Sequence, residues 1–170
     1  MGLLRHRDGD AAQRFQMRER LLSIGDDYWI EDQSGDRAFL VDGKALRVRD
    51  TWLMKDTEGK DVAEIKERKL SVRDKMTIDL DGRHATVTKR AIGIRDHFKV
   101  EVDGGDDLKV HGNIVDHEYE IERDGDKVAE ISKKWFRVRD SYGVEIAPGV
   151  DPVLILAVTV AVDGMSHDIG

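Results

Sequence analysis

The sequence predicts a mainly β protein: a closed antiparallel barrel of about twelve strands, built from six hairpin repeats around a central hydrophobic C-terminal helix. Three observations lead to this prediction. They are a strand pattern that recurs along the chain, a glycine at a fixed distance after each copy, and one wholly apolar segment near the end. At 170 residues the chain is long enough to form one domain with its own core.

A short pattern occurs six times. Each copy has apolar residues three positions and one position before a reference residue, with Asn113 as the exception, and apolar residues three and five positions after it. Alternation of this kind is typical of a half-buried strand. The reference residues lie 21 to 24 positions apart and are Gly25, Arg49, Arg73, Arg95, Asp116 and Arg139.

A glycine follows each reference residue by nine or ten positions, often beside an aspartate, as in Asp81-Gly82 and Asp124-Gly125. Such pairs favour hairpin turns because glycine and its neighbour accept positive φ. A second, shorter strand comes next, for example at 62–65 and 128–131. Each copy therefore predicts one hairpin, and the resulting sheet is expected to close because closure removes both of its edges.

The apolar segment from Pro152 to Val162 is the candidate to fill the barrel, because a twelve-stranded wall encloses a hollow. Asp151 and Pro152 suit a helix N-terminus: aspartate can cap, and proline is tolerated at the first helical position. A helix with no polar face has to be surrounded. A buried strand is the alternative, since Val, Ile and Thr dominate the segment. The expected helix covers about residues 151–168.

Composition limits the domain organisation and the class of function. Residues 1–16 predict a flexible polar segment, and residues 17–170 predict a single barrel domain. The absence of cysteine excludes disulfides, thiolate metal sites and thiol nucleophiles. A net charge of -7 disfavours nucleic acid as a partner. The longest apolar run is well short of the ~20 residues of a membrane-spanning helix. We expect a cytoplasmic monomer without a cofactor, peripheral at a membrane if it binds one, with an unidentified protein or lipid partner.

Several stretches carry a resemblance to a known family: LSVRDK at 70–75, HEYEI at 117–121, VAEISKKWF at 128–136, and LILAV at 154–158 followed by Asp163 and His167-Asp168. Together, in this order, they resemble the LURP-one-related family, within the tubby-like and phospholipid-scramblase-like group of folds. The resemblance covers about residues 17–168. It implies a twelve-stranded barrel around a C-terminal helix, and no assigned catalytic reaction. Tubby-like relatives bind phosphoinositides, but their lipid-binding residues match no motif here.

Acidic residues directly follow five of the six reference residues, and a basic residue or histidine stands five positions before each. Carboxylates in a barrel wall need backbone amides, cations or solvent at the rim. Repetition favours a structural ring of ion pairs over an anion or metal site. The predicted ring comprises Asp26, Asp50, Asp74, Asp96, Asp140, Arg20, Lys44, Arg68, Arg90 and Lys134.

Basic residues also recur near the ends of three predicted hairpins, and this recurrence predicts a patch for an anionic ligand along one rim of the barrel. The interleaved Glu67 and Glu130 leave a solvated rim as the alternative. The patch comprises Lys66, Arg68, Lys69, Lys89, Arg90, Lys133 and Lys134.

Three histidines lie in or beside the fourth and fifth copies, and suggest a metal or acid/base site, with strand bracing as the alternative. They are His97, His111 and His117, close to Asp96, Asp116 and Glu118. No nucleophile elbow, phosphate-binding glycine loop or dinucleotide motif occurs. The sequence therefore predicts a non-enzymatic binding or scaffold module. The alternative is a peripheral binder of anionic phospholipid headgroups through the basic rim, and a hydrolase using His or Asp is a distant third.

Overall fold

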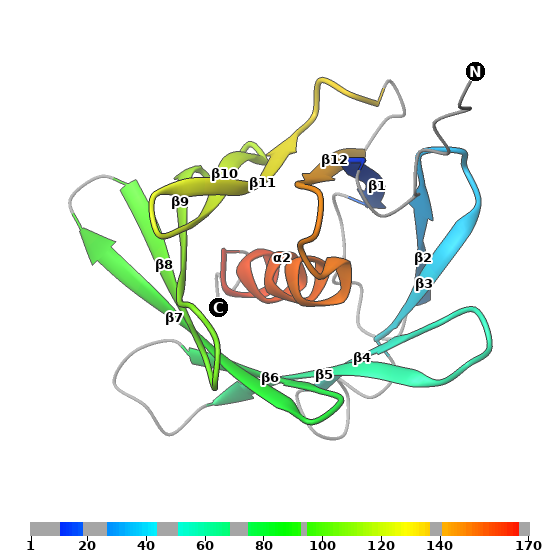
Figure 1. Cartoon of the computed structure of the whole chain (residues 1–170), viewed down its shortest axis with the longest axis horizontal. Helices are drawn as coiled ribbons and strands as arrows, with labels where there is room; N and C mark the ends of the chain where they lie inside the picture. The colour runs from blue at the N-terminus through cyan, green and yellow to red at the C-terminus, as the bar shows by residue number, and fades with distance from the viewer. Residues whose placement is uncertain are drawn as a thin grey trace, which may run out of the picture.

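A computed structural model of the protein describes residues 11–18, 27–43, 51–68, 75–92, 95–136 and 141–166. Over these residues the chain forms a closed antiparallel barrel with the strand order β1-β12-β11-β10-β9-β8-β7-β6-β5-β4-β3-β2. The helix α2 (Pro152–Ser166) lies in the middle, enclosed by the strands (Figure 1). The predicted fold class, a closed antiparallel barrel of about twelve strands around a central C-terminal helix, is confirmed.

Five hairpins of the predicted kind make up most of the wall. In the two-residue turn between β10 and β11, Asp124 and Gly125 have φ values of 52° and 86°, the positive pair that such a turn requires. The strands are β1 (Gln13–Arg18), β2 (Asp27–Asp32), β3 (Arg37–Asp42), β4 (Thr51–Lys55), β5 (Asp61–Arg68), β6 (Lys75–Leu80), β7 (Arg83–Ile92), β8 (Arg95–Val102), β9 (Leu108–Asn113), β10 (Glu118–Arg123), β11 (Asp126–Ser132) and β12 (Ser141–Ile146).

The sixth strand pair differs from the predicted repeat, because it is not a hairpin. The chain after β12 turns at Gly149 (φ 76°) and enters α2. β12 pairs instead with β1 from the other end of the chain, in register from Gln13 opposite Ile146 to Arg18 opposite Ser141. β1 also pairs with β2. The two ends of the described chain therefore close the barrel together.

β1 begins at Gln13, four residues before the position where the sequence places the start of the domain. Its two inward side chains, Phe15 and Met17, are 6% and 0% exposed. Polar residues alternate with them, so the sequence of this segment alone suggests a polar tail. Only the pairing with β12 shows that it is a strand of the barrel. The inward pair shows why the strand belongs to the barrel.

The core consists of the inward side chains of the wall packed around α2. The helix is buried continuously from Leu154 to Met165, and it contacts β5, β6, β7 and β12. Asp151 caps it, because the backbone N–H of Val153 donates to Asp151 Oδ1 at 3.0 Å. The helix prediction is confirmed and the strand alternative is wrong: burial on every side outweighs the β propensity of the segment. No helix in the described part of the chain is long and apolar enough to cross a membrane.

Candidate functional site

A hollow of about 400 Å³ lies on the outer face of β7, β8 and β9. Phe98 and Val100 of β8 are buried in the core, so the side chains that alternate with them point outward. The volume lies within the range of small-ligand sites. The side chains around the hollow that can carry positive charge are Arg90, His97, Lys99, Lys109 and His111.

Strand register gathers these five side chains in two rows. In one row, Arg90 lies opposite His97, and His97 lies opposite His111. In the other row, Lys99 lies directly opposite Lys109. Like charges directly opposite each other destabilise a sheet. The hollow therefore concentrates hydrogen-bond donors and positive charge on a protein whose net charge is -7.

Carboxylates of the described residues contact or lie opposite three of these five side chains. Lys99 Nζ is 3.1 Å from Glu101 and 3.9 Å from Asp107. His111 Nε2 is 2.8 Å from a carboxylate oxygen of Glu122. Lys109 has Glu122 directly opposite it on β10, but no ion pair joins the two in the part of the chain that the structure describes. Such an arrangement can accept an anion at its centre.

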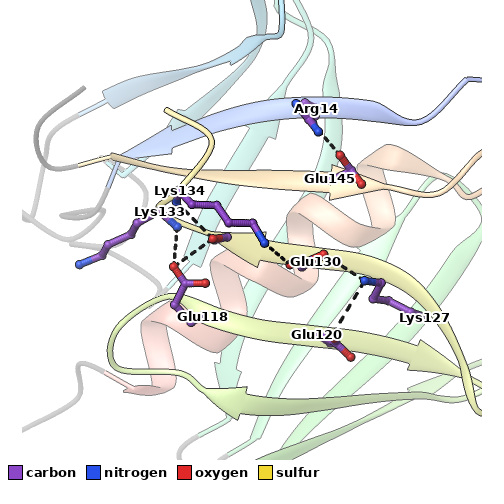
Figure 2. A network of polar contacts seen from close by, with 9 residues as sticks. Arg14, Glu118, Glu120, Lys127, Glu130, Lys133, Lys134 and Glu145 are labelled. Carbon is purple, nitrogen blue, oxygen red and sulfur yellow. Dashed lines mark hydrogen bonds and ion pairs between the residues drawn. The ribbon is translucent and has the colours of Figure 1, made fainter. Parts of the chain in front are cut away.

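On the neighbouring wall, made of β10 to β12 with β1, the cations Arg14, Lys127 and Lys134 each contact a carboxylate (Figure 2). Lys127 Nζ lies 3.0 Å from Glu130 and 3.9 Å from Glu120, and Lys134 Nζ lies 3.0 Å from the other oxygen of Glu130. Hydrogen bonds from Lys127 and then Lys134 lower the pKa of Glu130 below its ordinary value. Arg14 pairs with Glu145 across β1 and β12 at 2.6 Å.

Two aromatic residues cover the same wall at Gly143 of β12. A Cβ at this position would lie 2.8 Å from a ring carbon of Phe136 and 2.9 Å from one of Trp135. The cations of Arg14 and Lys134 each lie 5.3 Å from the Trp135 ring, within the range of a cation–π contact. This aromatic cover therefore holds the segment after β11 against the seam between β11, β12 and β1.

The predicted basic patch is spread around one rim of the barrel. Lys66 and Arg68 lie at the end of β5, Lys89 and Arg90 near the end of β7, and Lys133 and Lys134 after β11, while Lys69 lies outside the described residues. Arg90 is the patch residue that lines the hollow. Lys66 pairs with Glu64 at 3.0 Å, and Lys134 with Glu130. Ligand binding by this patch stays a prediction.

The predicted acid/base ring also stays a prediction, because most of it falls outside the described residues. Arg68, Arg90 and Lys134 are described and exposed, and Lys134 is paired with Glu130, which is not a member of the ring. The other members are Asp26, Asp50, Asp74, Asp140, Arg20 and Lys44, together with the side chain of Asp96.

The three histidines do not form one site. His97 and His111 line the outer hollow, whereas His117 is 1% exposed and lies inside the barrel. His117 takes a φ of 53° in the turn before β10. Its ring stacks on Tyr142 with centroids 4.1 Å apart, and its Nδ1 is 3.5 Å from Asp163 of α2. The wall of the barrel therefore separates His117 from the other two.

Asp163 is the centre of a buried polar layer near the end of α2. The hydroxyl of Tyr142 donates to it. Burial, and secondarily the nearby Asp163 carboxylate, raises the pKa of Tyr28, Tyr119 and Tyr142 well above the ordinary value. Three of the six repeat copies supply these tyrosines at the same position, three residues after the reference residue. At 2% exposure, Asp163 is shielded from any substrate in this structure, and the layer attaches the helix to the wall.

Sequence reasoning missed the lysine pair that lines the hollow. Lys99 and Lys109 are ten positions apart and belong to two strands of one hairpin. The glycines at 104 and 105 mark the turn, but only the register of β8 with β9 shows that the two lysines oppose each other. Pairing the strands outward from that turn is the signal that could have found them.

Comparison with known proteins gives a family and a fold. A family model described as LURP-one-related matches residues 13–163. The uncharacterized protein YxjI of Bacillus subtilis (strain 168) is 26% identical over 149 residues, which is 86% of this chain and 90% of that protein. An X-ray structure of the Arabidopsis thaliana protein AT5G01750 superposes with a TM-score of 0.63 at 16% identity, covering 94% of each chain.

Proposed function

This chain belongs to the LURP-one-related family, and we propose that it is a non-enzymatic binding module whose β7–β9 wall binds a phosphate-bearing anion. One observation carries the proposal: the hollow is lined by Lys99 directly opposite Lys109, and by Arg90 directly opposite His97. Like charges so placed repel each other, and an anion seated between the two ammonium groups offsets that repulsion.

The other donors suit the same ligand. Arg90 adds a planar guanidinium, the group best matched to phosphate oxygens. His97 and His111 add ring nitrogens beside it. The protein as a whole repels anions, because its net charge is -7. Binding to the hollow therefore depends on short-range, charge-assisted hydrogen bonds, which are roughly twice as strong as neutral ones.

A free phosphate compound and a phospholipid headgroup share this chemistry, so the test includes a probe for each. The predicted rim patch is the lipid alternative, and Arg68 belongs to it but not to the hollow. A hydrolase using His117 and Asp163 is disfavoured because these side chains are only 1% and 2% exposed. A scaffold role is compatible with the same fold, but no described contact favours it over anion binding.

The test is calorimetric titration with inorganic phosphate, combined with sedimentation of phosphatidylcholine vesicles with and without a phosphoinositide. Lys109→Gln removes one charge-assisted contact worth about 1.5–3 kcal/mol, so we expect at least tenfold weaker phosphate binding. Lys127→Gln, on the neighbouring wall, is the matched control and should bind as the wild type does. Added salt should weaken binding.

The variants also separate the sources of phosphate. If Lys109→Gln weakens vesicle binding and Arg68→Gln does not, the hollow binds the lipid headgroup. If Arg68→Gln weakens vesicle binding and Lys109→Gln does not, the basic rim binds it. Phosphate binding without vesicle binding would assign a free compound. No binding to either probe, or equal weakening by Lys109→Gln and Lys127→Gln, would reject the hollow as the binding site.

A further inference from the structure

A cluster of metal-ligating side chains lies on the outer wall, where β9 meets β10. His111, Glu120 and Glu122 each offer one ligand atom, and these three atoms lie within 4.8 Å of one another. Strand register produces the cluster, since Glu120 lies directly opposite His111 and Glu122 is the next residue on the same face of β10. The side chains are held by two paired strands, and such elements position ligands more accurately than loops do.

We propose that His111, Glu120 and Glu122 bind one divalent transition-metal ion of the Zn²⁺ type. Zn²⁺ takes imidazole nitrogen and carboxylate oxygen ligands at about 2.0–2.2 Å, which places tetrahedral ligand atoms about 3.4 Å apart. The three ligand atoms, now within 4.8 Å of one another, would have to move closer on binding. The site shares His111 with the anion hollow, but its other two ligands, Glu120 and Glu122, do not line the hollow.

The two carboxylates of the cluster attract a cation, although Lys109 and Lys127 lie directly opposite Glu122 on the two neighbouring strands. Two carboxylates stand two residues apart on one face of β10, and like charges so close repel each other. His111 Nε2 lies 2.8 Å from Glu122, and Lys127 Nζ lies 3.9 Å from Glu120. A divalent ion in the cluster would neutralise both carboxylates and use the ring nitrogen that now faces Glu122.

The ligand set distinguishes between classes of metal. Ca²⁺ and Mg²⁺ prefer sites made of oxygen ligands, whereas an imidazole with carboxylates suits Zn²⁺ and the neighbouring first-row ions. Three protein ligands leave a coordination position open to water or an anion. The contact between His84 and Asp79 has a histidine and one carboxylate, and it supplies a matched control.

The test is titration of the metal-free protein, prepared with a chelator, with ZnCl₂ in a phosphate-free buffer. We expect one saturable site per chain and an increase in melting temperature on binding. His111→Ala and Glu122→Gln should each weaken Zn²⁺ binding at least tenfold, since loss of even an outer-shell partner costs 10- to 100-fold. His84→Ala should leave it unchanged. Melting of each variant without metal checks its folding.

Two results would overturn the proposal. One is the absence of saturable Zn²⁺ binding by the wild-type protein. The other is equal weakening by His111→Ala, Glu122→Gln and His84→Ala, which would indicate scattered surface binding. Zn²⁺ binding that survives loss of Lys109 while phosphate binding is lost would show that the metal site stands apart from the hollow.

Discussion

The β7–β9 wall and the β10–β12 wall belong to one barrel and pack around the same helix, yet their surface charges are arranged differently. On β10–β12 with β1, the cations Arg14, Lys127 and Lys134 each contact a carboxylate, and aromatic rings cover the seam. On β7–β9, Lys99 also contacts Glu101 and Asp107, but it lies directly opposite Lys109, a like-charge pair that lines the hollow. The first wall pairs opposite charges, whereas the second keeps a repulsive pair at the proposed binding site.

The largest expected effect comes from the helix that supports both walls. Leu156 of α2 is 0% exposed, so Leu156→Asp would bury an unpaired carboxylate at a cost of several kcal/mol, against a typical total stability of about 5–15 kcal/mol. Val115→Asp is the matched control, because Val115 is 69% exposed. Urea unfolding measures both variants. Similar losses from the two would contradict the central position of α2.

The aromatic cover of the β10–β12 wall gives the second prediction. Gly143→Ala places a methyl group 2.8–2.9 Å from carbons of Phe136 and Trp135, and overpacking of this kind typically costs about 1–3 kcal/mol. At Gly105, beside the β7–β9 wall, the nearest contact is a Val102 side-chain carbon at 3.3 Å. Gly105→Ala should therefore change stability by less than about 0.5 kcal/mol. If thermal unfolding shows the reverse order, the cover is not packed as described.

The same substitution on the two walls should change stability by different amounts. Lys109→Gln removes repulsion from Lys99 and attraction to Glu122, which lie directly opposite it on either side, so the free protein should change by less than about 0.5 kcal/mol. Lys127→Gln removes contacts with Glu120 and Glu130 and should destabilise it by about 0.2–1 kcal/mol. Denaturant midpoints at low salt measure the difference. Equal destabilisation by the two substitutions would remove the electrostatic distinction between the walls.

The smallest expected effect is a pH dependence on the β10–β12 wall. Hydrogen bonds from Lys127 and Lys134 lower the pKa of Glu130 in the folded protein. Its contribution to stability is therefore complete above the ordinary pKa of 4.5 and is lost as the pH falls through the lowered value. Glu130→Gln should make melting temperature less dependent on pH in that acid range. An unchanged acid profile would show that the pairing adds nothing measurable.

Local pattern predicts some parts of this molecule and not others. Periodicity and turn chemistry within short segments predict the inward residues of the even-numbered strands (β2 to β12), the hairpin glycines and α2. Closure by β1 depends on a partner more than a hundred residues away. The polar alternation around Phe15 and Met17 gives no indication of that partner.

The candidate site was harder to predict because it depends on register between strands. Spacing along the chain places His97, His111 and His117 near one another, whereas the strands point two of them outward and the turn at His117 points the third inward. Similarly, Lys99 and Lys109 meet only once β8 and β9 are aligned. The sequence pattern did not indicate that Lys99 and Lys109 line one hollow with Arg90.

The most direct test of anion binding is a backbone amide NMR titration of the ¹⁵N-labelled protein with inorganic phosphate, which compares both walls in one sample. We predict progressive, saturable shifts at amides of residues 97–99 and 109–111, with little change at 127–130. Shifts concentrated in 127–130, or none on either wall, would contradict the assignment of the β7–β9 hollow as the anion-binding surface.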